Sequence, residues 1–384
     1  MNLTVGIGLL GCGNVGSSVA DRLVRDRRAI EARTGVGYEL RAVAIRRPDK
    51  RRLDSLDPAL FTTDPLAVAG NPAIDLVIEL IGGTAVAAEL LDHALEAGQH
   101  VVTANKDLLG LQGPRLRAFA AARGTHLRFE GAIAGAIPIV RVLDRALAGD
   151  RIDAVAGAVN GTSTFILAAM EEGAGYEAAL GRAQECGYAE ADPANDVDGV
   201  DAAHKLALAA QLAFESPVVS PSIARRGISG VTRRDVARAR MLGLRIRSVG
   251  AIVRAGGEIW AEVAPVALPE EHEFARTFGV ENAVRIDARD AGTLFLRGQG
   301  AGGTATASAV LGDVVTALRS IHENRNALRR PRARAAAPSP VGVLPLFSQL
   351  PRIAELPHYP IWDDAILAAP AAQQSAALSG PGKD

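Results

Sequence analysis

The stretch that decides the fold is TVGIGLLGCGNVGSSVADRLVRD, Thr4 to Asp26, where an apolar run meets three glycines and a helical pattern follows. Gly11, Gly13 and Gly16 give the spacing G-x-G-x-x-G between an expected strand and an expected helix. In such a place the first glycine makes the turn, the second lets the backbone approach a pyrophosphate, and the third permits close helix–strand packing. The stretch indicates a dinucleotide site, although a plain tight turn has the same spacing.

The first 130 residues continue in the same alternation of strand and helix. Apolar runs predict strands at 4–10, 39–45, 75–81, 100–103 and 127–130. Helical patterns at 84–97 and 107–122 lie between them, and Gly113-Pro114 predicts an interruption of the second helix. This alternation predicts βαβ units, and therefore a doubly wound α/β domain with a parallel sheet.

A second α/β region with its own sheet is expected from about residue 135. Its helices are predicted at 138–147, 163–172, 176–186 and 201–214, and its strands at 151–159, 247–254, 258–267, 283–288 and 293–297. Gly256-Gly257 is the expected hairpin turn between two of these strands. After a last helix at 304–322, the Pro- and Ala-rich residues 329–384 are predicted to be mostly a tail, with the more apolar LPLFSQLPRIAELPHYPIWDD able to dock.

The composition is that of an ordinary globular protein, with 48% hydrophobic residues, 22% charged residues and a formal net charge of -1. This balance favours neither nucleic acid nor an anionic membrane as a partner. The stretch 225–247 holds eight arginines against one aspartate, but no aromatic residues lie between them. It therefore predicts a solvated helix face or an anion-binding surface rather than a nucleic-acid site.

The sequence carries no membrane or secretion signal that we can identify. No apolar run reaches the roughly 20 residues that a membrane span needs, and no signal peptide is evident. The two cysteines are Cys12, inside the glycine turn, and Cys186. Because that position makes a structural disulfide unfavourable, we expect small reduced side chains and a cytoplasmic protein.

Arg46 and Arg47 end the second expected strand, where a dinucleotide site usually has a ribose-binding acid. Guanidinium groups suit a 2′-phosphate, so this pair favours NADP over NAD. A surface arginine pair without a ligand is the alternative interpretation.

Two further stretches have a chemical and a structural interpretation each. VVTANKDLL, residues 101–109, places Lys106 at the sheet edge where ligands bind, either to reach a cofactor or substrate oxygen or simply to begin a helix. FEGAIAGAIPIV, residues 129–140, places Glu130 before small residues that let the backbone curl. Its carboxylate and the carbonyls that follow suit a hard monovalent cation, and a hinge between domains is the alternative.

Carboxylates are crowded in YAEADPANDVDGVDAAHKLALAA, residues 188–210, ahead of a helix that carries Lys205. They are Glu190, Asp192, Asp196, Asp198 and Asp201. Asp201 and Lys205 are four residues apart and share a helix face. The loop suits a cation or a substrate ammonium, with Lys205 as proton donor, but a surface loop with a plain salt bridge has the same pattern. A second glycine loop, in residues 296–315, opens the last helix and suits the nicotinamide side of a cofactor.

In this order, these stretches resemble homoserine dehydrogenase. The resemblance runs from about residue 4 to about residue 325 and is carried by GLLGCGNVG, DLVIELIGGT, VVTANK, EGAIAGAIPIV, VNGTSTFIL, GYAEADPANDVDGVDAAHKLA and GQGAGGTATASAV. It implies a Rossmann-type NAD(P)-binding domain at 1–135, a catalytic and dimerisation domain at 136–303, and a helix at 304–328 that returns to the first domain. It also implies a homodimer that reversibly interconverts L-homoserine and L-aspartate 4-semialdehyde, on the route to threonine, methionine and isoleucine.

The resemblance further implies roles for individual residues. Lys205 would be the catalytic acid/base, Glu190 and Asp201 would hold the amino acid, and Lys106 would contact substrate or cofactor. The cofactor would be NADP, with NAD possible, bound by Gly11, Gly13, Asn14, Val15, Gly16, Arg46, Arg47, Gly83, Thr84, Thr103, Lys106, Gly300 and Gly302. A sodium or potassium ion would be held by the Glu130 carboxylate and the carbonyls of Ile133, Gly135 and Ile137.

One departure from the family concerns regulation. Many members end in a regulatory ACT domain with a βαββαβ pattern, and the residues after 325 lack that rhythm. We therefore expect no ACT domain and no threonine inhibition through one. Another amino-acid dehydrogenase or a non-catalytic NAD(P)-binding sensor would share the glycine turn but would not need Glu190, Asp201 and Lys205. Homoserine-dependent reduction of NADP and NAD separates these three possibilities.

Replacing Arg46 and Arg47 together with alanine should weaken NADP(H) binding far more than NAD(H) binding. Each charge-assisted contact to the 2′-phosphate contributes roughly 1.5–3 kcal/mol, and NAD(H) lacks that phosphate. Fluorescence titrations of wild type and variant with both cofactors measure the dissociation constants. Equal losses for the two cofactors would remove the argument for NADP.

Overall fold

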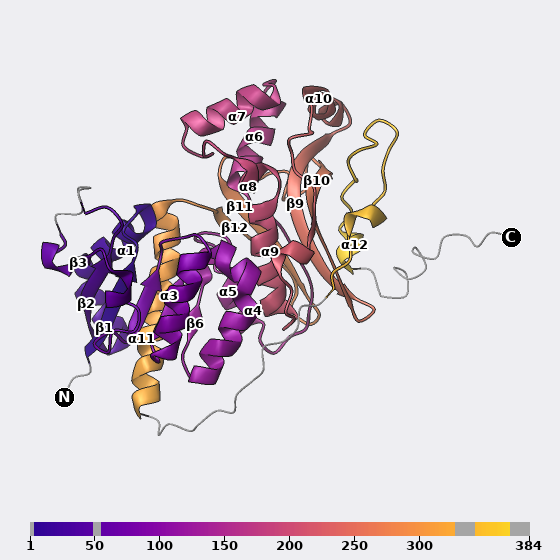
Figure 1. Cartoon of the computed structure of the whole chain (residues 1–384). Coiled ribbons are helices and arrows are strands. Elements are labelled where there is room, and N and C mark those ends of the chain that lie inside the picture. The colour runs from indigo at the N-terminus through magenta and orange to yellow at the C-terminus, as the bar shows by residue number, and fades with distance from the viewer. Residues whose placement is uncertain (1–3, 49–54, 327–341, 369–384) are drawn as a thin grey trace. The chain divides into compact units, whose positions relative to one another are not determined.

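The computed structural model describes residues 4–48, 55–326 and 342–368 and divides into two compact units (Figure 1). The first unit comprises Met1–Pro138 and Gly302–Ser339, and the second comprises Ile139–Ala301 and Pro340–Asp384. Among the described residues, no helix is both long enough and apolar enough to cross a membrane.

The first unit is built on a six-stranded sheet of order β3-β2-β1-β4-β5-β6, in which every pairing is parallel. The strands are β1 (Thr4–Leu10), β2 (Gly37–Ala44), β3 (Phe61–Thr62), β4 (Leu76–Glu79), β5 (His100–Thr103) and β6 (Leu127–Arg128). The strand order reverses between β1 and β4, and ligands of open α/β sheets bind at the carboxyl ends beside such a reversal. The parallel doubly wound sheet predicted from the sequence is confirmed.

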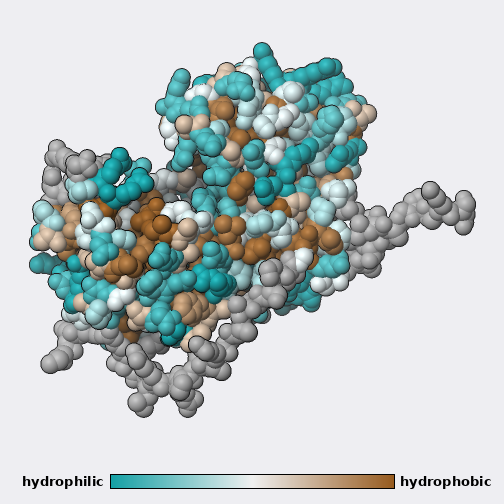
Figure 2. Space-filling model, viewed as in Figure 1, coloured by the Kyte–Doolittle hydropathy of each residue, from teal (hydrophilic) through white to brown (hydrophobic). Residues whose placement is uncertain are grey.

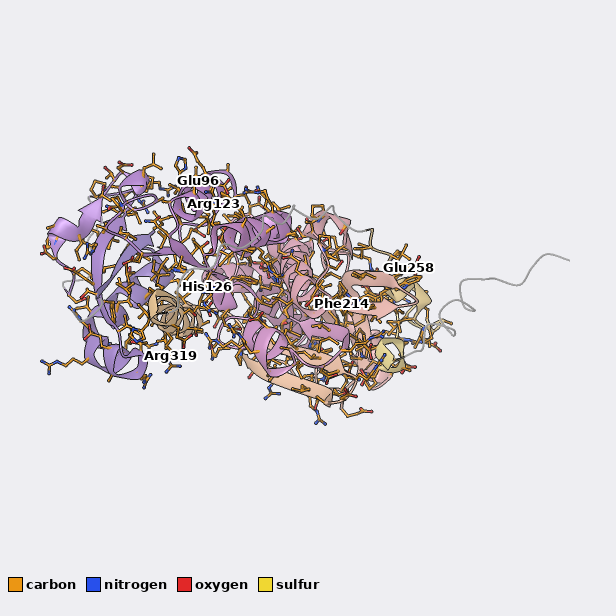
Figure 3. The ribbon with its side chains drawn as sticks, turned by 90° about the horizontal axis from the view of Figure 1, so that it is seen from below. Glu96, Arg123, His126, Phe214, Glu258 and Arg319 are labelled. Atoms are coloured by element: carbon orange, nitrogen blue, oxygen red, sulfur yellow. The ribbon has the colours of Figure 1, made fainter. Side chains whose placement is uncertain are left out.

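Helices from both ends of the chain complete this unit. They are α1 (Asn14–Arg25), α2 (Arg27–Thr34), α3 (Ala85–Glu96), α4 (Lys106–Arg123) and α11 (Gly303–Asn326), with short turns η1 (Pro58–Leu60), η2 (Pro65–Ala67) and η3 (Glu130–Ala132). One core joins β1, α1 and α11 through buried residues such as Leu9, Val19 and Leu318. Two polar contacts join elements of this unit. Glu96 of α3 pairs with Arg123 of α4, and Arg319 of α11 donates to the Arg33 carbonyl at 2.8 Å; Glu96, Arg123 and Arg319 are labelled in Figure 3.

The interruption predicted at Gly113-Pro114 is wrong, because α4 continues from Lys106 to Arg123 with Pro114 inside it. A proline in a helix removes one backbone hydrogen bond and costs about 3 kcal/mol. Leu108, Leu109 and Leu116 are fully buried on either side of this proline. Tertiary packing on both sides therefore holds the helix together through the proline.

The second unit has a six-stranded sheet of order β12-β11-β7-β9-β10-β8. Its strands are β7 (Ile152–Ala158), β8 (Ala224–Arg225), β9 (Leu244–Ala255), β10 (Glu258–Pro269), β11 (Glu281–Ala288) and β12 (Gly292–Gln299). All pairings are antiparallel except that of β8 with β10. Gly256 and Gly257, with φ of 62° and 85°, form the predicted turn between β9 and β10.

Helices cover one face of this second sheet. They are α5 (Ile139–Arg141), the π-helical turn η4 (Val142–Ala146), α6 (Gly161–Glu171), α7 (Tyr176–Glu185), α8 (Ala194–Val197), α9 (Val200–Ala213) and α10 (Arg233–Met241), with η5 (Ser220–Ser222) between α9 and β8. Of these, α6, α9 and α10 contact the strands directly. The predicted helices at 163–172, 176–186 and 201–214 are confirmed to within a few residues.

The solvated face expected for the arginine-rich stretch 225–247 is wrong at Arg247, which is 0% exposed on β9. Its Nη1 lies 2.6 Å from Glu171 Oε1, and its Nη2 donates to the Ala275 carbonyl at 3.0 Å. Arg245 approaches the other oxygen of Glu171 to 2.7 Å. A guanidinium is tolerated in the core here because a carboxylate and backbone carbonyls surround it.

The expected tail is wrong for residues 342–368, which pack on the second sheet, whereas the docking considered for the apolar segment 344–364 is confirmed. Leu346, Phe347 and Trp362 belong to one buried cluster with residues of β7, β9 and β10. The segment includes η6 (Phe347–Gln349) and α12 (Ala365–Ala368). It has no βαββαβ pattern in this described part, and the remaining residues of the expected tail, 329–341 and 369–384, lie outside the described residues.

The same segment covers the open edge of β10 in two places. Leu344 exchanges backbone hydrogen bonds with Ile259 and Ala261, at 2.9 and 2.7 Å. Farther along β10, Ala267 donates to the Pro360 carbonyl at 2.9 Å and accepts from the Trp362 amide at 2.8 Å. Prolines such as Pro345 and Pro351 lack the N–H that a longer ladder needs, so the pairing stays at isolated bridges. For this reason the segment lacks the alternation of apolar and polar residues by which a strand is predicted from sequence.

Phe347→Ala and Trp362→Ala should each lower the free energy of unfolding by roughly 3–5 kcal/mol, as large-to-small changes in a core do. Met241→Ala, at a side chain that is 78% exposed, is the matched control and should change it by less than about 0.5 kcal/mol. Urea denaturation followed by tryptophan fluorescence and circular dichroism measures all three variants. If both core variants unfold like wild type, the segment contributes no packing energy.

Candidate active site

The glycine turn after β1 has the geometry that a dinucleotide needs. Gly11 has φ of +96°, and a Cβ on it would come within 2.7 Å of the Leu80 carbonyl oxygen. A Cβ on Gly16 would lie 2.1 Å from the Gly11 carbonyl oxygen, so α1 approaches the turn as closely as glycine permits. Around Gly13, by contrast, none of the described atoms lies within 4 Å of an added Cβ. The open position is therefore the one where a pyrophosphate would approach the backbone.

The start of α11 and the end of β2 both lie beside this turn. A Cβ on Gly303 would be 3.2 Å from the Asn14 carbonyl oxygen, so the first residue of α11 contacts the beginning of α1. The Gly11 amide donates to the Ala44 carbonyl, the last residue of β2, at 3.0 Å. Arg46 and Arg47 follow two and three residues later and are exposed, so their preference for a 2′-phosphate stays a prediction.

The ends of β4 and β5 form the neighbouring part of the same sheet edge. Gly83 has φ of +72°, and Thr84 is the residue before α3. Lys106 is the first residue of α4, and its Nζ lies 3.3 Å from Asp107 Oδ1. These expected cofactor contacts therefore share one edge with the glycine turn, as the positions of their strands in the sheet require.

Apolar side chains are exposed at this edge. Ile81 is 39% exposed after β4, and Val86 is 58% exposed at the start of α3. Figure 2 shows apolar surface among polar surface on the first unit. A flat aromatic ring of a cofactor gains free energy by covering such side chains.

The loop expected to hold a cation begins at η3. Glu130 is buried, and its backbone amide donates to Asp313 Oδ2 of α11 at 2.7 Å. Gly135, with φ of +60°, lets the following backbone curl, and the Ile137 amide donates to the Ala134 carbonyl at 3.1 Å. Among the residues that the structure describes, no group of three His, Cys, Asp or Glu side chains could hold a metal. The fit to a monovalent ion rests on backbone carbonyls and one carboxylate.

Lys205 is the central charged group of the second unit. It is 9% exposed on α9, and its Nζ lies 2.7 Å from Asp201 Oδ2 and donates to the Val159 carbonyl at 2.6 Å. Asp201 is buried as well. The prediction that Asp201 and Lys205 share a helix face is confirmed, and the burial of both side chains distinguishes the pair from a surface salt bridge.

Two residues around this pair, Asn160 and Thr162, were not singled out as binding residues by the sequence, and both lie at the start of α6, where they contact Asp196 of α8. Asn160 Nδ2 donates to Asp196 Oδ1 at 2.7 Å and to Asp201 Oδ2 at 2.9 Å. Thr162 Oγ1 lies 2.9 Å from Asp196 Oδ2. Asn160 also caps α6, because its Oδ1 accepts from the Ser163 amide at 2.8 Å. An asparagine just before a helix was the available signal for this position.

The structure does not bring every acidic residue of the loop into this cluster. Glu190 is exposed, and within the described part of the chain its side chain joins none of the hydrogen bonds around Lys205. Asp192 accepts from the Ala194 amide at 3.1 Å and so begins α8. Asp196 and Asp201 are the two carboxylates that the fold places together, through Asn160.

The second glycine loop has a packing role at one of its two expected contacts. A Cβ on Gly300 would lie 2.1 Å from Cγ of Asn282, which is buried beneath it. Gly302 has φ of +113°, which disfavours any other residue. Packing therefore requires glycine at 300, and the backbone conformation requires it at 302, whether or not a cofactor contacts them.

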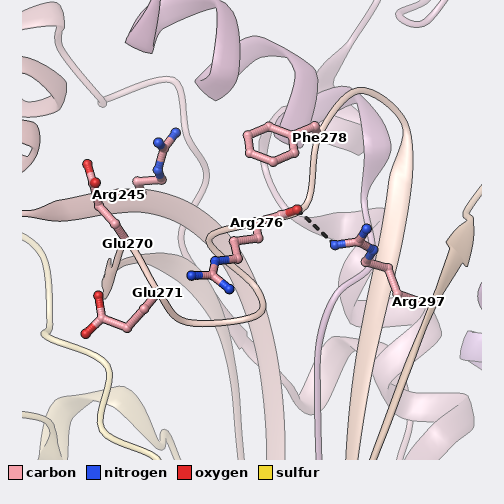
Figure 4. A pocket seen from close by; sticks show the side chains of 6 residues that line it. All are labelled: Arg245, Glu270, Glu271, Arg276, Phe278 and Arg297. Carbon is pink, nitrogen blue, oxygen red and sulfur yellow. Dashed lines mark hydrogen bonds between the residues drawn. The ribbon is translucent and has the colours of Figure 1, made fainter.

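A separate pocket of about 650 Å³ lies on the second unit (Figure 4). Its lining consists of Arg245, Glu270, Glu271, Arg276, Phe278 and Arg297. The Arg297 Nη1 donates to the Arg276 carbonyl at 3.2 Å, and the guanidinium of Arg245 lies 5.9 Å from the centre of the Phe278 ring. None of the six residues belongs to the cluster around Lys205.

The parallel doubly wound sheet with its open glycine turn defines the class of dinucleotide-binding proteins. Comparison with known proteins agrees. The family model of homoserine dehydrogenase matches residues 138–315, and that of the homoserine dehydrogenase NAD-binding domain matches residues 11–130. A homoserine dehydrogenase of Pseudomonas aeruginosa is 41% identical over 325 residues, which cover 84% of this chain and 74% of that protein. One of Bacillus subtilis is 37% identical over 316 residues, covering 82% and 73%.

Solved structures give the same answer. The crystal structure of a homoserine dehydrogenase from Thiobacillus denitrificans aligns with a TM-score of 0.82 at 39% identity, covering 90% of this chain and 80% of that one. A hyperthermophilic archaeal homoserine dehydrogenase mutant in complex with NADPH aligns with a TM-score of 0.69 at 26% identity, covering 82% and 98%. The chain belongs to the homoserine dehydrogenase family, oxidoreductases that act on the homoserine alcohol.

Asn160→Asp should lower the free energy of unfolding at neutral pH, because it places a third carboxylate against Asp196 and Asp201. Like charges raise the pKa of a carboxyl in the folded state, so the loss should shrink as the pH falls through the acidic range. We expect a loss of roughly 1–3 kcal/mol at pH 7, the cost of an unpaired buried polar group. Urea titrations at pH 7 and pH 5 measure it. Asn160→Ser keeps the helix cap without the charge, and an equal, pH-independent loss in both variants would contradict this account.

Proposed function

We propose that this chain interconverts L-homoserine and L-aspartate 4-semialdehyde with NADP(H) as the preferred cofactor and Lys205 as the group that moves the proton. The observation that carries the proposal is the buried Lys205 ammonium, held 2.7 Å from Asp201 and 2.6 Å from the Val159 carbonyl. A lysine fixed in this way on a helix has one proton to exchange with a substrate oxygen and cannot swing away into water.

The hydride and the hydroxyl proton both leave the substrate in oxidation and both return to it in reduction, but they are exchanged with different groups. The cofactor supplies or accepts the hydride; in oxidation the substrate hydroxyl loses its proton to Lys205, and in reduction Lys205 returns it to the aldehyde oxygen. A neutral amine accepts the proton in oxidation, and an ammonium donates it in reduction. We therefore expect homoserine oxidation to be fastest at alkaline pH and aldehyde reduction to proceed at neutral pH.

Other charged residues are proposed to bind the ammonium group of the substrate and the nicotinamide and 2′-phosphate ends of the cofactor. Glu190 and Asp201 are proposed to hold the amino acid, with Lys106 at the nicotinamide end. Glu190 is exposed, so this role requires the substrate to draw the loop at 188–192 inward. The glycine turn is proposed to hold the pyrophosphate, and Arg46 and Arg47 the 2′-phosphate. The archaeal relative in complex with NADPH supports a phosphorylated cofactor.

Three finer features belong to the same proposal. A sodium or potassium ion is proposed at Glu130 and the carbonyls of Ile133, Gly135 and Ile137, where it would fix the loop that follows β6. The active form is proposed to be a homodimer in the cytoplasm. The buried carboxylate of Glu130 and the curled backbone at Gly135 support the cation.

Lys205→Ala should lower kcat by roughly 10²–10⁴, the usual scale for the loss of a general acid or base, while NADP(H) affinity changes little. Glu190→Gln should raise the KM for homoserine more than it lowers kcat, because it removes charge from a binding group and not from the proton path. Steady-state kinetics in both directions, with cofactor binding measured separately by fluorescence, test both variants.

Two results would overturn the assignment. A near-normal kcat in Lys205→Ala would remove its role in proton transfer, and Lys106 would become the next residue to replace. A wild-type protein that binds NADP but reduces none with homoserine would favour a non-catalytic sensor.

A further inference from the structure

A fully buried carboxyl group lies at the carboxyl end of β4, and the proton transfer described above does not use it. Glu79 is 0% exposed, next to the sheet edge where the glycine turn opens. Burial raises the pKa of its carboxyl, and hydrogen bonds from Thr103, Gly82, Ile81 and Asn105 oppose that rise. An apolar side chain would fill this position at lower cost. The carboxylate therefore needs a reason beyond packing.

Each oxygen of Glu79 reaches a different segment of the sheet edge. Oε1 accepts from the backbone amides of Ile81 and Gly82, at 3.0 and 3.2 Å, which belong to the loop after β4. Oε2 accepts from the hydroxyl of Thr103, the last residue of β5, at 2.5 Å. Glu79 and Thr103 are register partners in adjacent parallel strands, so one side chain connects two strand ends.

The connection continues from Thr103 back to the first loop. Thr103 Oγ1 accepts from the Asn105 amide at 2.9 Å, and Asn105 Nδ2 donates to the Gly83 carbonyl at 2.7 Å. Asn105 Oδ1 accepts from the Leu108 amide at 3.1 Å and so caps α4, whose first residue is Lys106. The bonds run from Glu79 through Thr103 and Asn105 to Gly83, and the ring closes through the adjacent Gly82, whose amide donates to Glu79. We call this ring of five residues the edge clamp.

The loop that the edge clamp holds lies directly on the glycine turn. The Leu80 amide donates to the Leu10 carbonyl at 2.7 Å. A Cβ added to Gly11 would clash with the carbonyl group of Leu80 and the side chain of Ile81. Gly82 and Gly83 both have φ of +72°, so this loop has little intrinsic preference for its observed shape. Without the carboxylate, the loop would lose the acceptor that fixes both Ile81 and Gly82.

We propose that Glu79 is a positioning residue of the cofactor site, whose carboxylate sets the places of Gly83, Thr84 and Lys106 before any cofactor binds. The inference rests on the proposed function for the cofactor role of those three residues. It extends that function by assigning the preorganisation of the site to a side chain too deeply buried to touch the cofactor. A preorganised loop binds its ligand more tightly because less conformational entropy is lost on binding.

Glu79→Gln is the first test, because the amide keeps the oxygen that Ile81 and Gly82 need but presents an N–H₂ group to Thr103. In the cofactor-free protein, hydrogen exchange at residues 80–84 should become faster by about tenfold or more. NADPH binding should weaken by about tenfold, while kcat at saturating cofactor falls by less than about threefold. Thr103→Val should give the same pattern of faster exchange and weaker NADPH binding. Thr103→Ser keeps the hydroxyl and should restore wild-type exchange and affinity.

Thr125→Val is the matched control, because it also removes a buried threonine hydroxyl from the first unit, one that donates to the Ala120 carbonyl at 3.1 Å. It should leave exchange at residues 80–84 and NADPH affinity unchanged. The double variant Glu79→Gln/Thr103→Val should lose no more affinity than the worse single variant, since both break one ring.

Wild-type exchange and affinity in Glu79→Gln and Thr103→Val would overturn the inference. The inference would also fail if Glu79→Gln, Thr103→Val and Thr125→Val all lowered global stability while NADPH affinity stayed unchanged. A wild-type protein that binds no NADPH would instead refute the proposed function, and the exchange measurement would still decide whether the edge clamp orders the loop.

Discussion

The structure of the first unit depends on one close approach, that of α1 to the glycine turn. A Cβ at Gly16 would stand 2.1 Å from the Gly11 carbonyl oxygen, and one at Gly11 would strike the loop after β4. Because glycine has no side chain at either position, the turn can be tight. The N-terminus of α1 then faces the open position at Gly13. The loop after β4 and the start of α11 then pack around the turn, so the sheet edge becomes a single surface.

Two buried cations of the second unit, Lys205 and Arg247, are each accompanied by a carboxylate, and these pairs organise that unit. Lys205 has Asp201 and a carbonyl, and Arg247 has Glu171 and two carbonyls. Glu171 ends α6, and the start of the same helix carries Asn160, which joins Asp196 to Asp201. An unpaired charge at these depths would cost several kcal/mol. The pairing therefore both permits burial and fixes the direction in which each charged group points.

Edges and loop ends, rather than strand centres, are where this chain uses irregular backbone. Residues 342–368 satisfy the edge of β10 by isolated bridges between prolines and place Phe347 and Trp362 on the face that the helices leave open. Glu79 satisfies the loop after β4 by side-chain acceptors. In both places an irregular segment meets the hydrogen-bonding needs of a sheet without extending it.

Local pattern is enough to predict the parallel sheet, the glycine turn, most of the longer helices and the shared helix face of Asp201 and Lys205, because each rests on local periodicity or on a spacing of three or four residues. It does not predict α2, α8, α10 or α12. Tertiary structure decided what depends on distant partners. Pro114 stays inside α4 because leucines on both sides are buried, and Arg247 is buried because Glu171 lies 76 residues earlier in the chain. Asn160 meets Asp196 and Asp201, and Glu79 meets Thr103, only once strands and helices have packed. A sequence pattern contains no record of such contacts, since nothing local requires them.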